Sequence, residues 1–171
     1  NLLLNTINTS GTGNNYGIWL DSSSNSNNVS STTIRSGGSS TNNYGLYIQG
    51  SSLNIIQNAT INTSGDISYG IFLRAASNYN NFTGVTINAT GVGSYGVHIR
   101  NSSVTARPAN NTFINTSISS ANASVVHVDT GTPNSTTYFI NVTFNHTNVS
   151  FGPLSSGNLD VCFAVCKRQG A

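Results

Sequence analysis

Short apolar runs recur along the first 150 residues with a nearly constant period, and polar bends separate them. The stretch from Asn54 to Arg74 shows the unit: a run ending in T-I-N, the bend S-G-D-I-S, and the run Y-G-I-F-L with alternating faces. The central residue of the T-I-N run marks six copies, at Ile7, Ile34, Ile61, Ile87, Ile118 and Phe144. These markers lie 27, 27, 26, 31 and 26 residues apart, a period typical of solenoid, propeller or array proteins.

Large apolar residues also keep fixed distances from this marker. One set lies five residues before it: Leu2, Val29, Ile56, Phe82, Phe113 and Phe139. A second set alternates along the last run of each copy: Ile18, Leu46, Ile71, Val97 and Val126. Strands of about 3 to 5 residues cannot bury a face alone, whereas stacked coils bury a continuous column. The pattern predicts an all-β fold, a parallel β-helix of about six coils of roughly 26–27 residues, with each set forming a buried column.

The repeated Tyr-Gly pairs and the Asn-rich bends resemble those of a known family of coiled β-structures. The pairs are Tyr16-Gly17, Tyr44-Gly45, Tyr69-Gly70 and Tyr95-Gly96. They are similar to the right-handed parallel β-helix of the pectate-lyase-like scaffold, which also occurs in archaeal and bacterial cell-surface repeat proteins. The resemblance covers about 150 residues and implies a right-handed β-solenoid. It implies no single activity, because this scaffold carries lyases, hydrolases, adhesins and surface fibres.

Asparagine recurs seven residues before the marker in four copies, at Asn27, Asn54, Asn80 and Asn111. An amide carries both donors and an acceptor, so stacked asparagines can hydrogen-bond to the coils above and below. This spacing predicts an asparagine ladder.

The repeat fails after residue 150, which divides the chain into a repeat array (1–150) and a C-terminal tail (151–171). The tail has no Tyr-Gly pair and contains both cysteines, Cys162 and Cys166. We expect it to cap the last coil or to reach into a neighbouring subunit. The two thiols are candidates for a disulfide within the tail or between subunits, and their spacing does not choose between these pairings.

The composition indicates an extracellular, cell-surface protein. Only 6% of the residues are charged, against about a quarter in typical soluble domains. The formal net charge is +2 and the arginines are scattered, so we expect no nucleic-acid partner. No run of about 18 apolar residues occurs, so we expect no membrane span. Because Asn1 is not a translation start, we expect a mature or trimmed product.

Aromatic residues recur on the opposite face of the last run, at Trp19, Tyr47, Phe72, His98 and His127. We expect this column to point outward as an apolar stripe that contacts a surface polysaccharide or a protein partner. His98 and His127 would lie about 5 Å apart, close enough to share a metal ion, but ring stacking is the favoured interpretation. We therefore expect no metal and no cofactor.

The acidic residues do not form an evident catalytic pair. Asp21, Asp66, Asp129 and Asp160 lie on different coils or at different offsets. Asp21 and Asp129 share an offset but lie four coils apart, about 19 Å, too far for the paired carboxylates of a glycosidase. Arg74 and Arg100 are neighbours in one column, either with an anion or carboxylate between them or as a solvated pair. We expect a protein without catalysis, with a polysaccharide lyase or hydrolase as an alternative.

The N-glycosylation signal N-x-[ST] is abundant, and it predicts covalent N-linked glycans as the source of solubility. The fourteen candidates are Asn8, Asn28, Asn58, Asn62, Asn81, Asn88, Asn101, Asn110, Asn115, Asn122, Asn134, Asn141, Asn145 and Asn148.

The two ends of the array are rich in large apolar residues, at Leu2, Leu3 and Leu4 and at Phe139, Phe144 and Phe151. Uncapped solenoid ends are complementary, and a head-to-tail contact between them does not close on itself. We therefore expect the subunit of a head-to-tail homopolymer, a surface filament. A carbohydrate-binding or adhesin module that uses the outward aromatic column is the first alternative. An ice-binding face is a further one, because Thr6, Thr33, Thr60, Thr86 and Thr143 share one offset.

Overall fold

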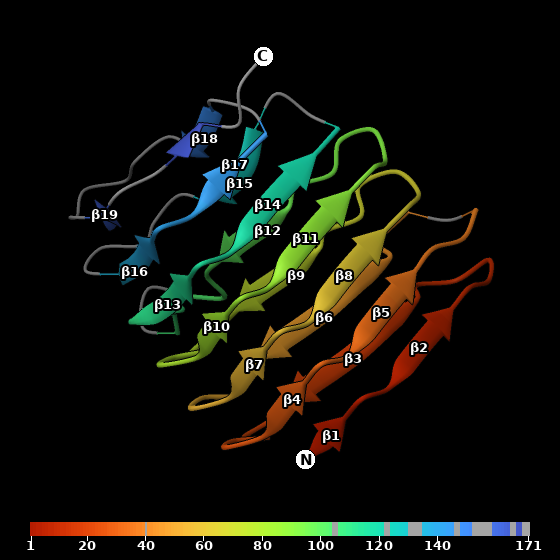
Figure 1. Cartoon of the computed structure of the whole chain (residues 1–171), viewed down its shortest axis with the longest axis horizontal. Coiled ribbons are helices and arrows are strands. Elements are labelled where there is room, and N and C mark those ends of the chain that lie inside the picture. The colour runs from red at the N-terminus through yellow and green to blue at the C-terminus, as the bar shows by residue number, and fades with distance from the viewer. Residues whose placement is uncertain are drawn as a thin grey trace.

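A computed structural model describes residues 1–39, 41–103, 106–121, 124–129, 135–145, 148–151, 159–164 and 167–168. All regular secondary structure in these ranges is β-strand. The strands form three parallel sheets, and Figure 1 shows the successive coils stacked along one axis. The described residues contain no helix of the length and apolarity that a bilayer-spanning segment needs.

The first sheet contains seven strands: β1 (Leu2–Leu3), β4 (Asn28–Ser30), β7 (Ile55–Gln57), β10 (Asn81–Thr83), β13 (Asn111–Ile114), β16 (Ser135–Ile140) and β19 (Leu159–Ala164). The second sheet also contains seven: β2 (Thr6–Thr9), β5 (Thr33–Ser36), β8 (Thr60–Thr63), β11 (Thr86–Ala89), β14 (Ser117–Ser120), β17 (Thr143–Phe144) and β20 (Lys167–Arg168). The third sheet contains six: β3 (Tyr16–Asp21), β6 (Tyr44–Gln49), β9 (Ile71–Arg74), β12 (Val97–Arg100), β15 (Ser124–Val128) and β18 (Asn148–Phe151).

Each strand pairs with the strand three places later in the chain, which is the connectivity of a solenoid. The described strands make six triplets, followed by β19 and β20. The isoleucine markers are in register from Ile7 to Ile34 and Ile61, and onward through Ile87 and Ile118. The prediction of an all-β parallel solenoid is therefore confirmed, and the spacing between markers sets the stacking register.

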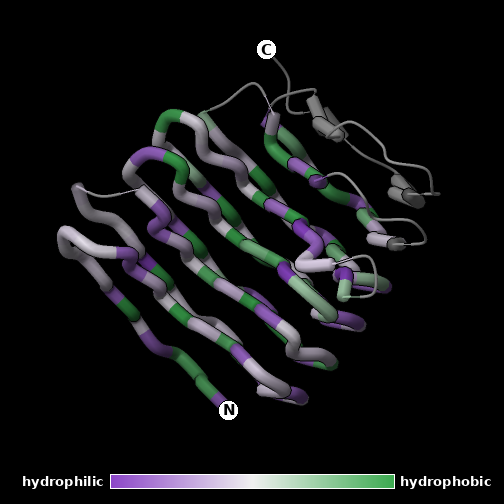
Figure 2. The backbone as a smooth tube through the Cα atoms, turned by 180° about the vertical axis from the view of Figure 1, so that it is seen from behind, coloured by the Kyte–Doolittle hydropathy of each residue, from purple (hydrophilic) through white to green (hydrophobic). Residues whose placement is uncertain are grey.

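Both predicted apolar columns are present inside the coil. In the first, Val29, Ile56 and Phe82 are aligned across neighbouring strands and buried. In the second, Leu46 aligns with Ile71, which aligns with Val97. Figure 2 shows short apolar and polar stretches alternating along every coil. Burying each of these side chains contributes about 1.5–3 kcal/mol, so the columns form the main core of the molecule.

The inner column changes from aliphatic to aromatic along the solenoid. Phe82 stacks on Phe113 with ring centroids 4.5 Å apart, and Phe113 stacks on Phe139 at 5.0 Å. All three rings are fully buried. A column of identical rings packs well because each ring lies on the ring of the next coil in nearly parallel orientation.

The predicted asparagine ladder is also confirmed. The Nδ2 atoms of Asn27, Asn54 and Asn80 donate to the Oδ1 atom of the next ladder asparagine at 3.1, 2.9 and 3.0 Å, ending at Asn111. The same three asparagines also donate their backbone N–H to that Oδ1 atom. Each amide oxygen thus satisfies two donors in a buried bend, where an unpaired polar group would be costly.

The glycine of each Tyr-Gly pair lies where the outer face meets the core. A Cβ atom added at Gly17, Gly45 or Gly70 would collide with the Cγ2 atom of an isoleucine marker in the next coil. The added Cβ atom would also collide with the carbonyl oxygen of the equivalent glycine in that same neighbouring coil, so the backbone would have to move. The motif therefore needs glycine for close packing rather than for a special backbone angle.

A second position that recurs from coil to coil has a left-handed backbone. The corner between the first and second strands is occupied by Asn58, Gly84, Asn115 and Asn141 in four successive coils, all with φ between 50° and 63°. Asparagine and glycine tolerate this region better than other residues. The N–H groups of this corner donate to the next coil, so it adds to the stacking.

The C-terminal segment continues the sheets of its own chain. β19 pairs with β16 and β20 pairs with β17, both in parallel register. Phe139 is consequently buried and Phe144 is packed against the core, so the expectation that both residues are contacts at a free end is wrong. Cys162 lies in β19 with its Cα opposite Tyr138. Cys166 lies outside the described residues, and its pairing stays a prediction, as does the domain boundary at residue 150.

Candidate functional site

The outer face of the third sheet carries the aromatic column that the sequence predicts. Trp19, Tyr47, Phe72, His98 and His127 occupy matching positions in β3, β6, β9, β12 and β15. Neighbouring rings are stacked or tilted, with centroids 5.8, 5.1, 4.8 and 5.2 Å apart along the column.

A second column, made by the tyrosines of the Tyr-Gly pairs, covers this first one. Tyr44 and Tyr69 stack on each other at 5.1 Å and meet Phe72 edge-on at 5.1 and 5.5 Å. Tyr47, Phe72 and His98 are therefore only 5% exposed. The expectation of an exposed aromatic stripe is wrong for these three residues, because the tyrosine side chains lie over the groove between adjacent rings.

Only the two ends of the column reach solvent. Trp19 lies in the outermost strand of the sheet and is 52% exposed. At the other end, the register of β12 and β15 places Ser124 where the preceding coils have a tyrosine. No tyrosine side chain extends over His127 from this position, and the His127 side chain is 20% exposed. A contact of Trp19 or His127 with a partner or glycan stays a prediction.

The column ends in a charged network around Asp129. The Nε2 atoms of His98 and His127 lie 3.0 and 3.1 Å from the Oδ1 atom of Asp129. The Nε atom of Arg100 lies 3.1 Å from the other carboxylate oxygen, Oδ2. One carboxylate therefore joins side chains from two coils, since His98 and Arg100 lie in β12 and His127 lies in β15.

The electrostatic environment favours an ionised Asp129 and a neutral His98. Burial alone raises the pKa of Asp129, but hydrogen bonds from His127 and His98 and favourable electrostatic interactions with the two imidazoles hold it well below its usual range. Burial lowers the pKa of His98 more than the neighbouring carboxylate raises it. An ionised carboxylate only accepts hydrogen bonds, so His98 carries its proton on Nε2 and donates it to Asp129.

This arrangement resolves two expectations from the sequence. Arg74 and Arg100 do share a column, and the carboxylate beside Arg100 is Asp129 of the same chain. Arg74 donates instead to the hydroxyl of Tyr47, 3.4 Å away. The sequence pattern also places Asp129 on the same face as His127, two residues further on, but does not by itself show a third metal ligand beside the two histidines. The structure provides one, because the ligand atoms of His98, His127 and Asp129 all lie within 4.8 Å of one another.

The signal for this cluster was present in the sequence. Asp129 lies two residues after His127, which puts both on one face of an extended segment. Strand periodicity does not predict that the Asp129 side chain extends to the preceding coil and contacts His98.

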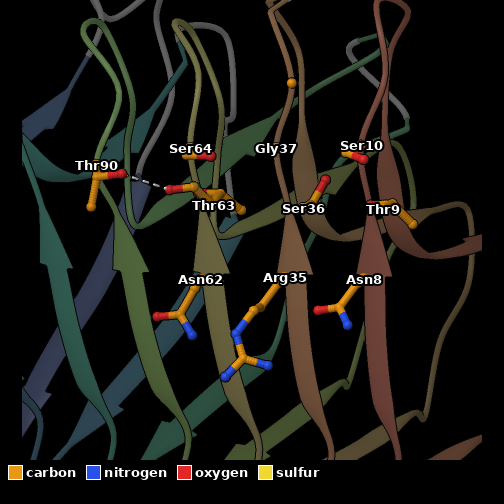
Figure 3. Close-up of a pocket in the computed structure, with 11 residues that line it drawn as sticks. Asn8, Thr9, Ser10, Arg35, Ser36, Gly37, Asn62, Thr63, Ser64 and Thr90 are labelled. Carbon is orange, nitrogen blue, oxygen red and sulfur yellow. Dashed lines mark hydrogen bonds between the residues drawn. The ribbon is translucent and has the colours of Figure 1, made fainter.

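A separate polar groove of about 400 Å³ lies at the C-terminal ends of strands in the second sheet. Figure 3 shows Asn8, Arg35 and Asn62 projecting in one row from β2, β5 and β8. The groove is completed by Thr9, Ser10, Ser36, Gly37, Gly38, Thr63, Ser64 and Thr90. Its single exposed cation and its many amide and hydroxyl groups suit a ligand rich in hydroxyl or anionic groups. The sequence interpretation did not identify this groove.

The glycosylation candidates that the structure describes with their side chains all lie outside the core. Six are exposed: Asn8, Asn58, Asn81, Asn115, Asn141 and Asn145. Five are half-buried: Asn28, Asn62, Asn88, Asn101 and Asn110. Asn148 lies in β18, while Asn122 and Asn134 lie outside the described residues. None of the four ladder asparagines belongs to a glycosylation signal, so attached sugar would not disturb the ladder.

Comparison with known proteins does not identify a family for this chain. Comparisons with protein-family models and with curated proteins give no match. Among solved structures, the chain is similar to a crystal structure described as a "putative glycosyl hydrolase" from Parabacteroides merdae. The identity is 10%, the TM-score is 0.44, and the match covers 84% of this chain and 77% of the other.

Proposed function

We propose that the protein is a structural, extracellular β-solenoid that carries N-linked glycans and joins further copies of itself head to tail into a surface filament. The observation that supports this proposal is the position of β1, β2 and β3, whose outer sides pair with no other described strand. These strands are the outermost members of all three sheets. An outermost strand offers unpaired peptide groups, and a strand of another chain can pair with them.

The hydrogen bonds of β2 identify the peptide groups available for pairing. Thr33 and Gly37 donate their N–H groups to the carbonyls of Asn5 and Thr9, so those peptides face the second coil. Peptide groups alternate in direction along a strand, so those of Thr6 and Asn8 face the open edge. Leu3 and Leu4 are 58% and 85% exposed beside them. A docked coil would cover both the peptide groups and these apolar side chains.

The opposite end presents the complementary set of strands. β18, β19 and β20 are the outermost described strands there. β19 and β20 pair in regular register with β16 and β17, whereas the pairing of β18 with β15 shifts its register once, between Ser124 and Val126. A second copy that docks its first coil on this end repeats the contact that already links successive coils. Such a contact leaves one free end after each addition, so it propagates as a filament instead of closing.

A role without catalysis agrees with the positions of the carboxylates. The column that starts at Asp21 continues through Gln49 and Arg74 to Arg100, and Asp129 follows in the next coil. Asp21 and Asp129 are therefore four coils apart, about 19 Å. A glycosidase needs two carboxyl groups within about 5–10 Å.

The assembly is tested by substituting Thr6 with proline. Thr6→Pro removes a donor that faces the open edge and leaves the internal hydrogen bonds of β2 in place. We expect filaments of the parent protein in electron microscopy and in sedimentation, filaments of Thr6→Ala, and monomers of Thr6→Pro. Monomers of the parent at every concentration, or filaments of Thr6→Pro equal to those of the parent, would contradict the proposal.

The glycans are tested by the intact mass of protein from its native source. The exposed glycosylation signals and the low charge content motivate this part of the proposal. We expect a mass above that of the polypeptide, which falls in steps when exposed asparagines such as Asn58 or Asn81 are replaced by glutamine. A native mass equal to 17.9 kDa would contradict it.

Binding of a surface polysaccharide is a second candidate function, and the groove around Arg35 favours it. This groove offers the cation of Arg35 between the amides of Asn8 and Asn62, and it replaces the buried aromatic column as the candidate contact. A glycan array with the parent and Arg35→Ala tests it. We expect binding of acidic glycans that Arg35→Ala loses, and no binding, or equal binding by both proteins, would exclude the groove.

A further inference from the structure

We propose that His98, His127 and Asp129 form a binding site for a divalent transition metal, best matched by Zn²⁺, that links the fourth and fifth coils. The ligand atoms are the Nε2 atoms of the two histidines and the Oδ1 atom of Asp129. This site does not depend on the assembly of filaments.

The distances are close to those of a tetrahedral zinc site. With bonds of about 2.0–2.1 Å, the ligand atoms of such a site lie roughly 3.3 Å apart. The two nitrogen-to-oxygen distances here are 3.0 and 3.1 Å. The two histidine nitrogens lie within 4.8 Å of each other, so they would have to approach to roughly 3.3 Å before one ion could take the place of the two N–H protons.

The donor set selects the class of metal. Two imidazoles and one carboxylate suit Zn²⁺ and related transition metals, whereas Ca²⁺ and Mg²⁺ prefer oxygen ligands alone. Three protein ligands leave one position of a tetrahedron for water. That position lies on the exposed side, because the side chains of His127 and Asp129 are 20% and 27% exposed while that of His98 is 6% exposed.

The surrounding side chains hold the three ligands in place before any ion binds. The ring of His98 stacks on Phe72 at 4.8 Å, and the ring of His127 stacks on Tyr95 at 4.7 Å. Arg100 donates to the Oδ2 atom of Asp129, which orients the carboxylate and leaves Oδ1 facing the histidines. Fixed ligands lower the entropic cost of binding, and outer hydrogen bonds of this kind tune metal affinity.

The surroundings of the second ring nitrogen of His98 set the metal affinity that we expect. The Nδ1 atom of His98 is buried and has no hydrogen-bond partner among the described residues. Histidines that bind metals normally donate their second N–H to a neighbour, and loss of that partner costs about 10- to 100-fold in affinity. We therefore expect an affinity lower by about this factor than that of a zinc site in which every imidazole is supported.

Titration of the full chain with Zn²⁺ in a calorimeter, and with Co²⁺ by visible absorption, tests the site. We expect one ion per chain, the spectrum of tetrahedral Co²⁺, and a rise in the temperature of unfolding with Zn²⁺. Asp129→Asn keeps a hydrogen-bond acceptor at this position but removes its charge. Asp21→Asn is the matched control, because Asp21 lies in the same column with Gln49 as its described neighbour in place of a histidine. Asp129→Asn and His127→Gln should weaken binding by roughly a hundredfold or more, since a direct ligand contributes more than an outer partner.

Three controls make the outcome decisive. Circular dichroism shows whether each variant is folded, and His146→Gln and Cys162→Ser/Cys166→Ser remove the other residues that bind zinc well. Binding that persists in these two variants and in Asp21→Asn but is lost in Asp129→Asn supports the site. If no ion binds saturably, if Asp129→Asn and Asp21→Asn bind equally, or if binding depends on the cysteines, the proposal is wrong. Zinc-induced shifts of the ring ¹⁵N resonances of His98 and His127 give a second readout, and shifts confined to His146 would also overturn it.

Discussion

Two aromatic stacks run along this solenoid, one inside the coil and one on the outer face of the third sheet. Phe82, Phe113 and Phe139 form the inner stack and are fully buried. Phe72 and His98 belong to the outer stack, with similar ring spacing and 5% exposure. The inner rings belong to the core that the three sheets enclose, whereas Tyr47 and Phe72 of the outer stack pack against the tyrosines of the Tyr-Gly pairs on the outer face.

This difference decides where polar chemistry can occur. Inside the coil, an ionisable group would have no water and no partner, so that column contains only apolar residues. On the outer face, the cover consists of rings with hydroxyl groups, and it stops where Ser124 replaces tyrosine. The histidines and Asp129 lie at that point. Four predictions test the comparison, in order of decreasing expected effect.

Truncation of one ring in each stack measures how firmly each is enclosed. Phe113→Ala should lower the free energy of unfolding by about 3–5 kcal/mol, because the closed coil cannot collapse around the cavity. Phe72→Ala should cost about 3 kcal/mol, the lower end of the same range, since the neighbouring tyrosines can move inward. Equilibrium unfolding in denaturant gives both values, and an equal or larger loss for Phe72→Ala would contradict the distinction.

The asparagine ladder tests whether a polar column can matter as much as an apolar one. Asn80→Ala leaves the backbone and side-chain N–H groups of Asn54 without their acceptor in a buried bend. We expect a loss of about 2–4 kcal/mol, measured by denaturant unfolding. The exposed Asn14→Ala is the matched control and should change stability by about 0.5 kcal/mol or less. Similar values for both variants would show that the ladder does not contribute.

Gly70 follows Tyr69, which packs against the outer stack, and it lies against Ile87 of the core. Gly70→Ala should destabilise the fold by about 1–3 kcal/mol, because its Cβ atom would collide with the Cγ2 atom of Ile87 and with the carbonyl oxygen of Gly96. Gly13→Ala, where an added Cβ atom meets nothing within 4 Å, should be nearly neutral. Thermal unfolding of the two variants compares them, and a neutral Gly70→Ala would show that the coils are more loosely packed than described.

The outer stack alone contains a group that responds to alkaline pH. Burial raises the pKa of Tyr44, and the neighbouring phenols raise it further, while Arg100 opposes them. The unfolded chain therefore loses the Tyr44 proton first as the pH rises above about 10, and this lowers the stability of the folded state there. Tyr44→Phe has no phenol to titrate at this position, so its free energy of unfolding should fall less steeply with rising pH. The difference in stability between parent and variant should therefore shrink above about pH 10. Denaturant unfolding at a series of pH values measures it, and parallel curves would contradict it.

The repeat spacing predicted the inner stack and the ladder correctly for a simple reason. In a parallel solenoid, residues at the same offset in successive copies become hydrogen-bonded neighbours. Ile56 and Phe82, or Asn54 and Asn80, therefore meet because of their distance along the chain. A column of alike residues needs no further information, and an insertion such as the 31-residue spacing before Ile118 is absorbed in a bend.

The outer face was predicted less well because offset does not determine side-chain direction. Alternation correctly placed Tyr47 and Phe72 outside the coil, but it did not show that Tyr44 and Tyr69 lie over them. A rotamer on an open face depends on neighbours from the same coil and from the next one, which a one-dimensional pattern does not contain.

The period, the register, the buried columns and the ladder all follow from the repeat spacing, because each of them depends only on the distance between equivalent residues. The tertiary structure decided which outer rings are covered, how the tail pairs with β16 and β17, and where the polar groove lies. It also brought Asp129 to His98, thirty-one positions earlier in the chain. That contact depends on the reach and rotation of two side chains across neighbouring coils, and strand periodicity does not specify either quantity.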